Sequence, residues 1–422
     1  MPTGLFPPLR TRLRLDSCSY SPLALKKIVD AYARSHSTGQ AHIALQIAEV
    51  SISSRHIPRV ASQVAQEMIA QRDQKVVQRR RRELPVRVSV TPEVVAVEVD
   101  GGRLRTRAND GGPGVHQPQN KEDKLACLVT LQSSVSEPDP QPEPPEMFRE
   151  PRRVQRLVQQ MKSWTANQLA EESSQAQEIA GEKPRSKKKQ KDRSSPQLLV
   201  RSCVASMSDS ESFGPMVAAE AQERGFYGAK RKAFVGDGAS YNWSIHRGYF
   251  GEFEPITDLL HALCYLYTAA SASSGTESEC WSRYEKWLLE CWQGRVSSVI
   301  GELKSIQERV GVPPEGEELD RKDVRRVVSE SLGYLENNAS RMDYPRYRRA
   351  GLPITSSLVE SLVGEFNDRV KERRKFWNRS AGEARGAEVI LQLRAAVLSQ
   401  DERLERFLAQ RPGNPHHRRK IA

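Results

Sequence analysis

The stretch that decides the fold is "VRVSVTPEVVAVEVDGGRLRTRANDGG", at residues 86–112. Before it, apolar residues recur with the helical period of 3.6; within it they alternate with period 2, which is typical of a β-strand. Val94 to Val99 lead directly into Asp100, and two glycines follow. A second apolar run, "KLACLVTL" at residues 124–131, predicts a neighbouring strand. We therefore expect an antiparallel sheet to begin here, with Asp100 at the end of a strand.

A second aspartate has the same setting. "AFVGDGASYNW" at residues 233–243 has the apolar end of a strand followed by Gly236, Asp237 and Gly238. Asp-Gly is also a common hairpin signal, so a plain turn is one interpretation. The other is that Asp237 is exposed at a strand end, where a ligand can approach the backbone. Upstream, the strand "QLLVRSCVASM" at residues 197–207 and the helix "GPMVAAEAQERG" complete a strand–helix–strand unit of α/β type.

The overall charge points to a polyanionic partner. The 422 residues carry a formal net charge of +12, which favours nucleic acid. No apolar run approaches the roughly 20 residues of a membrane span, and the first residues lack the pattern of a signal peptide. The six cysteines form no C-x-x-C pair, so we expect free thiols in a reducing compartment, that is, a cytoplasmic protein without structural zinc.

Residues 1–85 predict an N-terminal helical region. One helix opens with Ser21 as a cap and Pro22 at its first position. Two further helical stretches, separated by the polar break "SISS", fit either a helix-turn-helix unit that binds DNA or a plain helical bundle. If the unit binds DNA, Arg55 and Arg59 at the start of the second helix are candidate contacts.

Two other regions differ in composition. Residues 134–196 are proline-rich and acidic at first and lysine-rich at the end, which predicts a flexible insertion with one exposed helix inside it. From Asp258 onward the pattern is almost entirely helical. It includes one long helix over residues 281–311, whose tryptophans we expect to build a helical core.

A third acidic residue completes a candidate metal site. Glu360 lies one turn into a helix that follows the loop "GLPITSS". Two strand-end aspartates and one helix-borne glutamate can gather around Mg²⁺ or Mn²⁺, and two such ions can promote cleavage of a phosphodiester. Each acid also has an ordinary explanation as a turn or surface residue. Asp110 in "RANDGG" competes with Asp100, although its polar flanks indicate a loop.

Several of these stretches together resemble one family. "VEVDGGRLRTR", "RGFYGAKRKAFVGDGASYNW", "FEPITDLLHALCYLYTAA" and "GLPITSSLVESLVGEFNDRVKERRKFW" are similar to bacterial insertion-sequence transposases of the DDE type, in the Kra-type, Mutator-like group. The resemblance runs through most of residues 95–405 and is lowest in 134–196. It implies an α/β fold: an RNase H-like mixed-sheet catalytic core, interrupted by an all-helical insertion with a small separate aromatic core. It also implies that Asp100, Asp237 and Glu360 are the metal-binding triad.

The resemblance adds two further groups of residues. Asp258 and His261 in "DLLH" match the D-x-x-H motif that follows the second aspartate in this family, and their spacing places both on one helix face. Asp258 is also an alternative to Asp237 as the second catalytic acid, although the glycine-flanked strand end favours Asp237, and His261 is equally well read as a packed helix residue. Beyond Glu360, a basic helix end is expected to contact DNA phosphates, unless its charges are merely solvated. It consists of Lys371, Arg373, Arg374 and Lys375.

The expected organisation and function follow. The domains are the N-terminal helical region 1–85, core segments 86–133, 197–275 and 350–400, the flexible insertion 134–196, the helical insertion 276–349 and a basic tail 401–422. The expected activity is Mg²⁺-dependent cleavage of element ends and transfer of the freed 3′-hydroxyl into target DNA. A homo-oligomer on DNA, in the bacterial cytoplasm at the nucleoid and without a membrane, would perform it. The alternatives are a structure-specific nuclease of the same fold, or a non-catalytic DNA-binding relic of a transposase.

Overall fold

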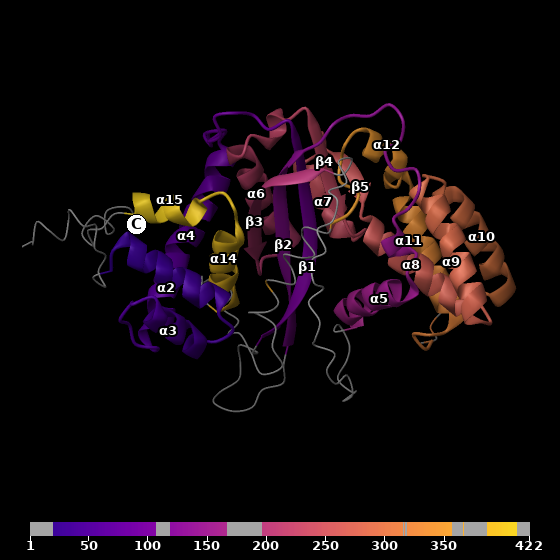
Figure 1. Cartoon of the computed structure of the whole chain (residues 1–422), viewed down its shortest axis with the longest axis horizontal. Coiled ribbons are helices and arrows are strands. Elements are labelled where there is room, and N and C mark those ends of the chain that lie inside the picture. Colours follow the sequence, from indigo (N-terminus) through magenta and orange to yellow (C-terminus); the bar gives the residue numbers. More distant parts are fainter. Residues whose placement is uncertain are drawn as a thin grey trace, which may run out of the picture.

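A mixed five-stranded sheet lies at the centre of the molecule (Figure 1). The computed structural model describes residues 20–106, 119–166, 196–314, 316, 319–356, 366 and 386–411. The strands lie in the order β3-β2-β1-β4-β5. Their bounds are β1 Val94–Thr106, β2 Gln119–Gln132, β3 Gln197–Ser206, β4 Arg231–Gly236 and β5 Glu254–Thr257. The expected α/β class is confirmed.

The sheet changes direction at β1. Strand β2 pairs antiparallel with both β1 and β3, whereas β4 pairs parallel with β1 and β5. In the parallel half, Val99 pairs with Gly236 and Gly236 pairs with Thr257, and these are the last rungs of the two ladders. The residue that follows each of them is an aspartate, so three aspartates lie at one end of three adjacent parallel strands.

The prediction that β1 ends at Asp100 is wrong. The strand continues to Thr106, paired with β2. Only its parallel pairing with β4 ends just before Asp100. Side chains of β2 and of Tyr241 crowd the two glycines after Asp100. A Cβ on Gly102 would lie 2.7 Å from Oδ1 of Asp123, and one on Gly101 would lie 2.9 Å from the hydroxyl of Tyr241 and 3.1 Å from Oε1 of Glu122. The glycines therefore permit close strand contact, and do not mark a strand end.

Both faces of the sheet are covered by helices, because alternate residues of β1 point to opposite sides. Val95, Val97 and Val99 pack with α6 (Ser210–Glu223) and α7 (Ser240–Tyr249). Val94 and Ala96 pack on the other side, against a larger helical layer. That layer consists of η1 Glu146–Phe148, α5 Pro151–Ala166, α8 Leu259–Ala272, α9 Glu277–Trp292, α10 Val296–Val310, α11 Val324–Asn338 and α12 Tyr344–Arg349. Two short 3₁₀ turns, η2 Phe226–Gly228 and η3 Ala339–Arg341, complete the connections.

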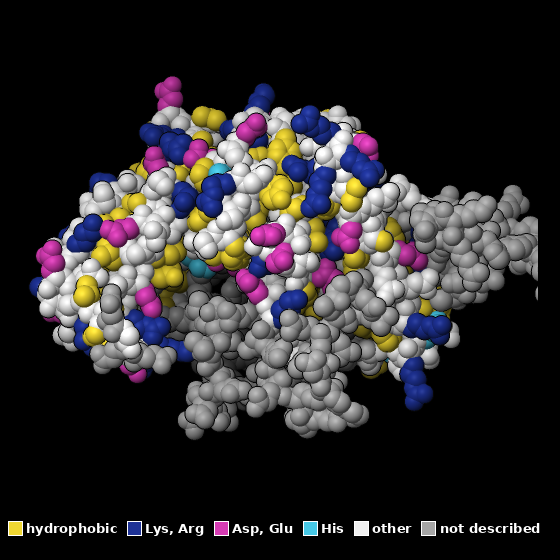
Figure 2. All heavy atoms as spheres, turned by 180° about the vertical axis from the view of Figure 1, so that it is seen from behind, with side chains coloured by type: hydrophobic (Ala, Val, Ile, Leu, Met, Phe, Trp, Pro, Cys, Tyr) yellow, Lys and Arg dark blue, Asp and Glu magenta, His cyan; other side chains and the backbone are white. Residues whose placement is uncertain are grey.

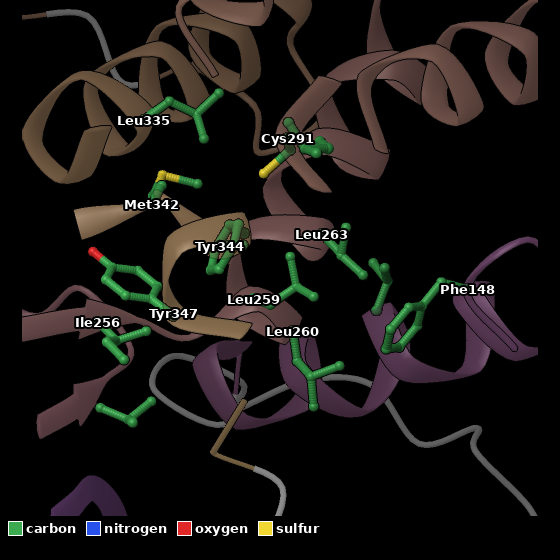
Figure 3. Close-up of a cluster of buried hydrophobic side chains, with 14 of the residues drawn as sticks. Phe148, Ile256, Leu259, Leu260, Leu263, Cys291, Leu335, Met342, Tyr344 and Tyr347 are labelled. Atoms are coloured by element: carbon green, nitrogen blue, oxygen red, sulfur yellow. The ribbon is translucent and has the colours of Figure 1, made fainter. Parts of the chain in front are cut away.

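The helical layer shares one core with the sheet. Figure 3 shows Ile256 of β5 in the same cluster as Leu259 of α8, Cys291 of α9 and Tyr344 of α12. Trp287 is fully buried in this core, so the expectation that tryptophans build it is confirmed. The expected separate core is wrong, because the buried side chains continue from the helices to the sheet.

The long helix expected over residues 281–311 is broken into α9 and α10. Gly294, at the break, has φ +75°, a left-handed conformation that costs glycine little. A Cβ there would lie 3.2 Å from Cδ of Pro345, so the tight passage against α12 also favours glycine. Helical periodicity continues across the break in the sequence, which is why the pattern alone did not show it.

Residues 134–159 are packed, not flexible as expected. Val154 and Val158 of α5 are 2% and 4% exposed in the shared core, so the helix is not an exposed one. The preceding segment is tied down as well: Nε1 of Trp292 donates to the carbonyl of Gln141 at 2.8 Å, and Arg348 binds the carboxylate of Asp139. The remainder of the expected insertion, residues 167–195, lies outside the described residues.

The N-terminal helices are confirmed and pack against the C-terminal part of the chain. They are α2 Pro22–Arg34, α3 Thr38–Ile47 and α4 His56–Arg80. Ser21 caps α2 as predicted, accepting a hydrogen bond from the Ala24 amide at 3.3 Å. These helices share a core with α14 (Ala387–Leu398) and α15 (Arg403–Gln410), at the β3 edge of the sheet (Figure 1). The connection between α3 and α4 spans residues 48–55, longer than the three- or four-residue turn of a helix-turn-helix unit.

The alternating valines before β1 are not a strand. Val86 and Val90 are 49% and 77% exposed, and the Arg87 amide donates to the carbonyl of Glu223 at 2.8 Å, at the end of α6. Pro85 and Pro92 flank this segment and have no amide hydrogen to donate to a ladder.

Among the described residues, no helix has both the length and the apolar character needed to cross a membrane. The five described cysteines are free thiols, as expected. On the face shown in Figure 2, Lys and Arg side chains are interspersed with Asp and Glu and do not gather in a single basic area.

Candidate functional site

The sheet register brings three of the predicted acids into one row. Asp100, Asp237 and Asp258 each follow the last parallel rung of their strands, where Val99, Gly236 and Thr257 pair. Because neighbouring strands lie about 4.8 Å apart and residues at the same level point to the same face, this row gathers carboxylates at one end of the sheet. The face is that of the helical layer.

Asp100 is buried but only partly hydrogen-bonded. It is 6% exposed, and its Oδ1 accepts the Gly101 amide at 2.7 Å. Its Oδ2 is buried and has no hydrogen-bond partner among the described residues. Burial, followed by the negative charge of Asp237, raises the pKa of Asp100 to about 7. This carboxylate thus lacks the donors that normally compensate a buried charge.

Asp237 lies between its own turn and α7. Its Oδ1 accepts the Ala239 amide and the side-chain amide of Asn242, both at 2.8 Å. The same Asn242 nitrogen approaches the Val99 carbonyl at 3.4 Å. Asn242 therefore links Asp237 to β1 at the residue preceding Asp100. The side chain of Asp237 remains half-buried.

The glycines that flank Asp237 serve the packing of the protein itself. Gly238 has φ +98°, and a Cβ there would lie 2.6 Å from Cε2 of Tyr334. A Cβ on Gly236 would lie 3.3 Å from Cβ of Asn242. Tyr334 in turn donates to the Asp237 carbonyl at 3.1 Å. We had interpreted both glycines as room for a ligand, but their neighbours are protein side chains. The chain does turn here, as the plain-turn interpretation expects, but the turn leads from β4 into α7 and not into the second strand of a hairpin.

Asp258 is fully buried, and both of its carboxylate oxygens accept hydrogen bonds. It caps α8 by accepting the Leu260 amide at 3.2 Å, and it also accepts the amide of Ser356 at 2.9 Å and its hydroxyl at 2.8 Å. Nδ1 of His261 lies 2.6 Å from its Oδ2. Burial would raise the pKa of Asp258, but the hydrogen bonds from His261 and Ser356 outweigh it and lower that pKa.

His261 is held as an imidazolium at neutral pH. Burial would lower its pKa, but the hydrogen bond to Asp258 and the charges of Asp258, Asp237 and Asp100 raise it to about 9. Its side chain is 20% exposed. The hydrogen bond to Asp258 places the imidazole of His261 beside the row of aspartates.

The arrangement separates the roles of the acids. Asp258 uses both oxygens to hold α8, Ser356 and His261, which leaves it poorly suited to bind a cation. Asp100 has an unused buried oxygen, and the described bonds of Asp237 all use Oδ1. The geometry thus favours Asp237 over Asp258 as the partner of Asp100.

The rest of the predicted site lies elsewhere or outside the described residues. Glu360, Asp110 and the basic helix end are not described: Lys371, Arg373, Arg374 and Lys375. The chain on either side of Glu360 is anchored, because Ser356 binds Asp258 and Phe366 is buried in the shared core. Arg55 and Arg59 are exposed on α4, which packs at the β3 edge of the sheet, two strands away from β1.

The described residues fit a cation only in part. Among them, no group of three or more His, Cys, Asp or Glu side chains is arranged to hold a metal ion. The pair Asp100 and Asp237 nevertheless supplies hard oxygen donors, and the unpartnered Oδ2 of Asp100 is the kind of atom that a divalent cation satisfies. A third ligand would have to come from beyond the described residues.

Sequence reasoning missed Asn242 and Ser356. Asn242 stands in "GDGASYNW", five residues after Asp237. The first turn of the helix that follows the glycines brings its side chain back to the Asp237 carboxylate. Ser356 stood in the polar end of "GLPITSS", but its partner Asp258 is 98 residues away, so no local pattern could reveal it.

Comparison with protein-family models and with curated proteins found no match. The roles of these residues therefore rest on their geometry and chemistry.

Proposed function

We propose that this protein is a DDE-type DNA transposase, which cleaves the ends of an insertion sequence and joins the freed 3′-hydroxyl to target DNA. The observation that carries the proposal is the pair Asp100 and Asp237. They stand level at the ends of adjacent parallel strands, and Asp100 retains a buried, unpartnered carboxylate oxygen. Their separation of 137 residues in the chain shows that the fold, and not a local motif, assembles the pair.

The mixed sheet is compatible with the proposed RNase H-like core. Three antiparallel strands, β1 to β3, are followed by β4 and β5, which run parallel to β1, in the order β3-β2-β1-β4-β5. The proposed catalytic acids Asp100 and Asp237 lie on β1 and directly after β4. The helices α9 to α11 enter between β5 and the Glu360 segment, in the place of the proposed helical insertion.

The acids suit Mg²⁺ or Mn²⁺, with Glu360 as the third ligand. When bound, the ions would supply activation of the attacking oxygen and stabilisation of the leaving oxygen at a phosphodiester. The protein's own contribution is to hold Asp237 in place through Asn242, and to keep His261 charged beside the carboxylates through Asp258. His261 lowers the repulsion between the acids, and its charge suits an approaching phosphate.

DNA is the proposed partner because of the charge of the chain, +12 in formal terms. The basic helix end after Glu360, residues 371–375, is the proposed phosphate contact beside the acids. Arg55 and Arg59, at the start of α4, would contact a separate DNA segment. Synapsis of two ends by a homo-oligomer, at the bacterial nucleoid, completes the proposal.

Of the two alternatives, the relic is the less favoured. A buried carboxylate oxygen without a donor, such as Oδ2 of Asp100, destabilises the fold, and such costs persist mainly where function requires them. A nuclease of the same fold would use the same acids, so only the fate of the cut DNA separates it from a transposase.

The decisive experiment replaces Asp237 with Asn. The substitution keeps the shape and removes the charge, so Mg²⁺-dependent nicking of labelled DNA carrying the terminal repeats that flank the coding region is expected to fall at least 100-fold, roughly the cost of losing one group of a cooperating set. Joining of the cut 3′-end to a second duplex by the wild type identifies a transposase, and release without joining identifies a nuclease.

Asp320→Asn is the matched control, because Asp320 is exposed in a loop and caps only the Lys322 amide. It is expected to nick as the wild type does. Wild-type nicking by a folded Asp237→Asn protein would remove Asp237 from the mechanism. A wild type that binds the end DNA and never cuts it would establish the relic.

A further inference from the structure

A polar cavity lies at the β3 edge of the sheet, and none of Asp100, Asp237 and Asp258 lines it. It has a volume of about 100 Å³ and is formed where α4, α6, α14 and α15 meet β3. This volume holds a few water molecules or one small ion and is too small for an organic cofactor. Six cationic side chains line it: Arg72, Lys75, Arg87, Arg224, Arg403 and Arg406.

Only three carboxylates in the lining oppose these six cations. Two of them, Glu220 and Asp401, are bound by Arg403 at 2.7 and 2.6 Å. The third, Glu223, is shared between Lys75 at 2.6 Å and Arg87 at 2.7 Å.

Of the remaining cations, Arg72 forms an ion pair at 2.6 Å with Glu388, which does not line the cavity. Arg224 and Arg406 are then left without a carboxylate within ion-pair distance among the described residues. The cavity therefore contains more positive charge than its walls neutralise.

Arg224 is the stronger indication, because it is 8% exposed. Its guanidinium donates to two hydroxyls, Oγ1 of Thr130 at 2.9 Å and Oγ of Ser202, and burial lowers its pKa. The nearest link from this guanidinium to a carboxylate runs through Ser202, whose hydroxyl donates to Asp401, so no direct ion pair offsets the desolvation of Arg224. It carries five N–H donors, of which these bonds use two.

Arg406 stands at the exposed rim of the same cavity. Its guanidinium donates to the Asp401 carbonyl at 2.7 Å, so it is positioned by the backbone and keeps its charge for another partner. Met68, Met216 and Phe407 form an apolar part of the wall. An apolar wall lowers the local dielectric, which strengthens attraction between the guanidinium groups and an anion.

We propose that this cavity is a binding site for a phosphate-sized oxyanion, held between Arg224 on the floor and Arg406 at the rim. The oxyanion is either a phosphate of a DNA backbone or free phosphate, and both present the same oxygens to the two guanidinium groups. The site is independent of the aspartates and of the function proposed for them.

The test is a titration of the full-length protein with inorganic phosphate, followed by thermal unfolding, with chloride at equal ionic strength as the reference. Phosphate is expected to stabilise the wild type beyond chloride. Arg406→Gln is expected to weaken the apparent affinity about five-fold or more, because a charge-assisted hydrogen bond is lost. Arg309→Gln is the matched control, since Arg309 is also an exposed helix arginine bonded only to a carbonyl, and it is expected to bind phosphate as the wild type does.

A second arm identifies the source of the oxyanion. If short duplex DNA competes with phosphate in the wild type, and Arg406→Gln weakens DNA binding more than Arg309→Gln, the site takes a backbone phosphate. If phosphate binds and DNA does not compete, the site takes free phosphate. Equal phosphate affinity of Arg406→Gln and the wild type, or no stabilisation beyond chloride, would overturn the proposal whatever the outcome at Asp237.

Discussion

The carboxylate of Asp100 destabilises the folded protein, yet it supplies an oxygen donor to the candidate site. It is buried beside the charge of Asp237 and has one oxygen without a donor, so the ionised form is poorly accommodated in the folded protein. A neutral side chain of the same shape would suit the position better. Such a carboxylate becomes favourable only when a cation approaches it, which is why stability and pH report on its role.

The pH dependence of stability follows from the pKa of Asp100, raised from 3.8 to about 7. Between these values the folded protein binds more protons than the unfolded chain, so this group lowers the free energy of unfolding as the pH rises through that window. In metal-free buffer, Asp100→Asn is therefore expected to match the wild type near pH 4 and to exceed its free energy of unfolding by about 1–3 kcal/mol at pH 8. Urea denaturation at both pH values measures the difference.

Magnesium supplies the control for that prediction. At pH 8, millimolar Mg²⁺ is expected to raise the melting temperature of the wild type and to have a smaller effect on Asp100→Asn, because a ligand that binds only the folded state stabilises it. If Asp100→Asn is less stable than the wild type at pH 8 without metal, then other groups of the folded protein already offset the cost of burying the ionised carboxylate, and the prediction is wrong.

At the scale of the element, the β4–α7 connection depends on Gly238. Its φ of +98° and the 2.6 Å approach of Tyr334 to a Cβ make any side chain unfavourable. Gly238→Ala is expected to lower the free energy of unfolding by about 2–4 kcal/mol, combining backbone strain with a forced shift of the ring. Thermal unfolding followed by circular dichroism tests this.

Gly248→Ala is the matched change within α7, because nothing lies within 4 Å of a Cβ there. It is expected to stabilise the protein by about 0.5–1 kcal/mol through helix propensity. Equal effects of the two substitutions would mean that the turn tolerates a side chain.

The sequence predicted those elements whose pattern is local. Strand β4 and the start of α8 at Asp258 were read correctly because apolar periodicity and polar caps coincide there. The continuation of β1 past Asp100 was missed because only the β2 side chains around Gly102 explain those glycines. For the site, the two strand aspartates were found from their glycine context. Asn242 and Ser356 were not, since their bonds exist only after the chain has folded.

The packed segment at residues 134–159 gives a second prediction at this scale. Phe148 is 8% exposed in the shared core, and its carbonyl accepts the hydroxyl of Tyr284 at 3.1 Å. Phe148→Ala is expected to lower the free energy of unfolding by about 3–5 kcal/mol, the usual cost of removing a buried ring. Val135→Ala, at a side chain that is 67% exposed, should change it by less than about 0.5 kcal/mol. Equal free energies of unfolding of the two variants would contradict the packing of this segment and would favour the flexible insertion that composition predicts.

At the scale of the whole molecule, helices from the beginning and from the end of the described chain pack together at the β3 edge of the sheet (Figure 1). The N-terminal helices share their core with Val389 and Leu393 of α14 and with Leu404 and Leu408 of α15. Nη2 of Arg34 also donates to the Val397 carbonyl at 3.1 Å. The N-terminal helices are therefore not an independent unit. Composition could not show this, because the partners are more than 300 residues apart.

Removing α15 should consequently loosen the beginning of the chain. A protein that ends at residue 400 loses Leu404 and Leu408, which are 3% and 2% exposed, and large buried side chains contribute about 2–5 kcal/mol each. That loss is comparable to the whole stability of a small domain, about 5–15 kcal/mol, so α2 and α4 are expected to exchange their amide hydrogens much faster. Strands β1 and β2 should keep their protection, because their core lies in the helical layer and against α6. A protein that ends at residue 411 retains α15 and the ion pair of Arg411 with Glu67, and it should exchange as the full chain does. Unchanged protection of α2 and α4 in the shorter protein would show that the N-terminal helices fold without their C-terminal partners.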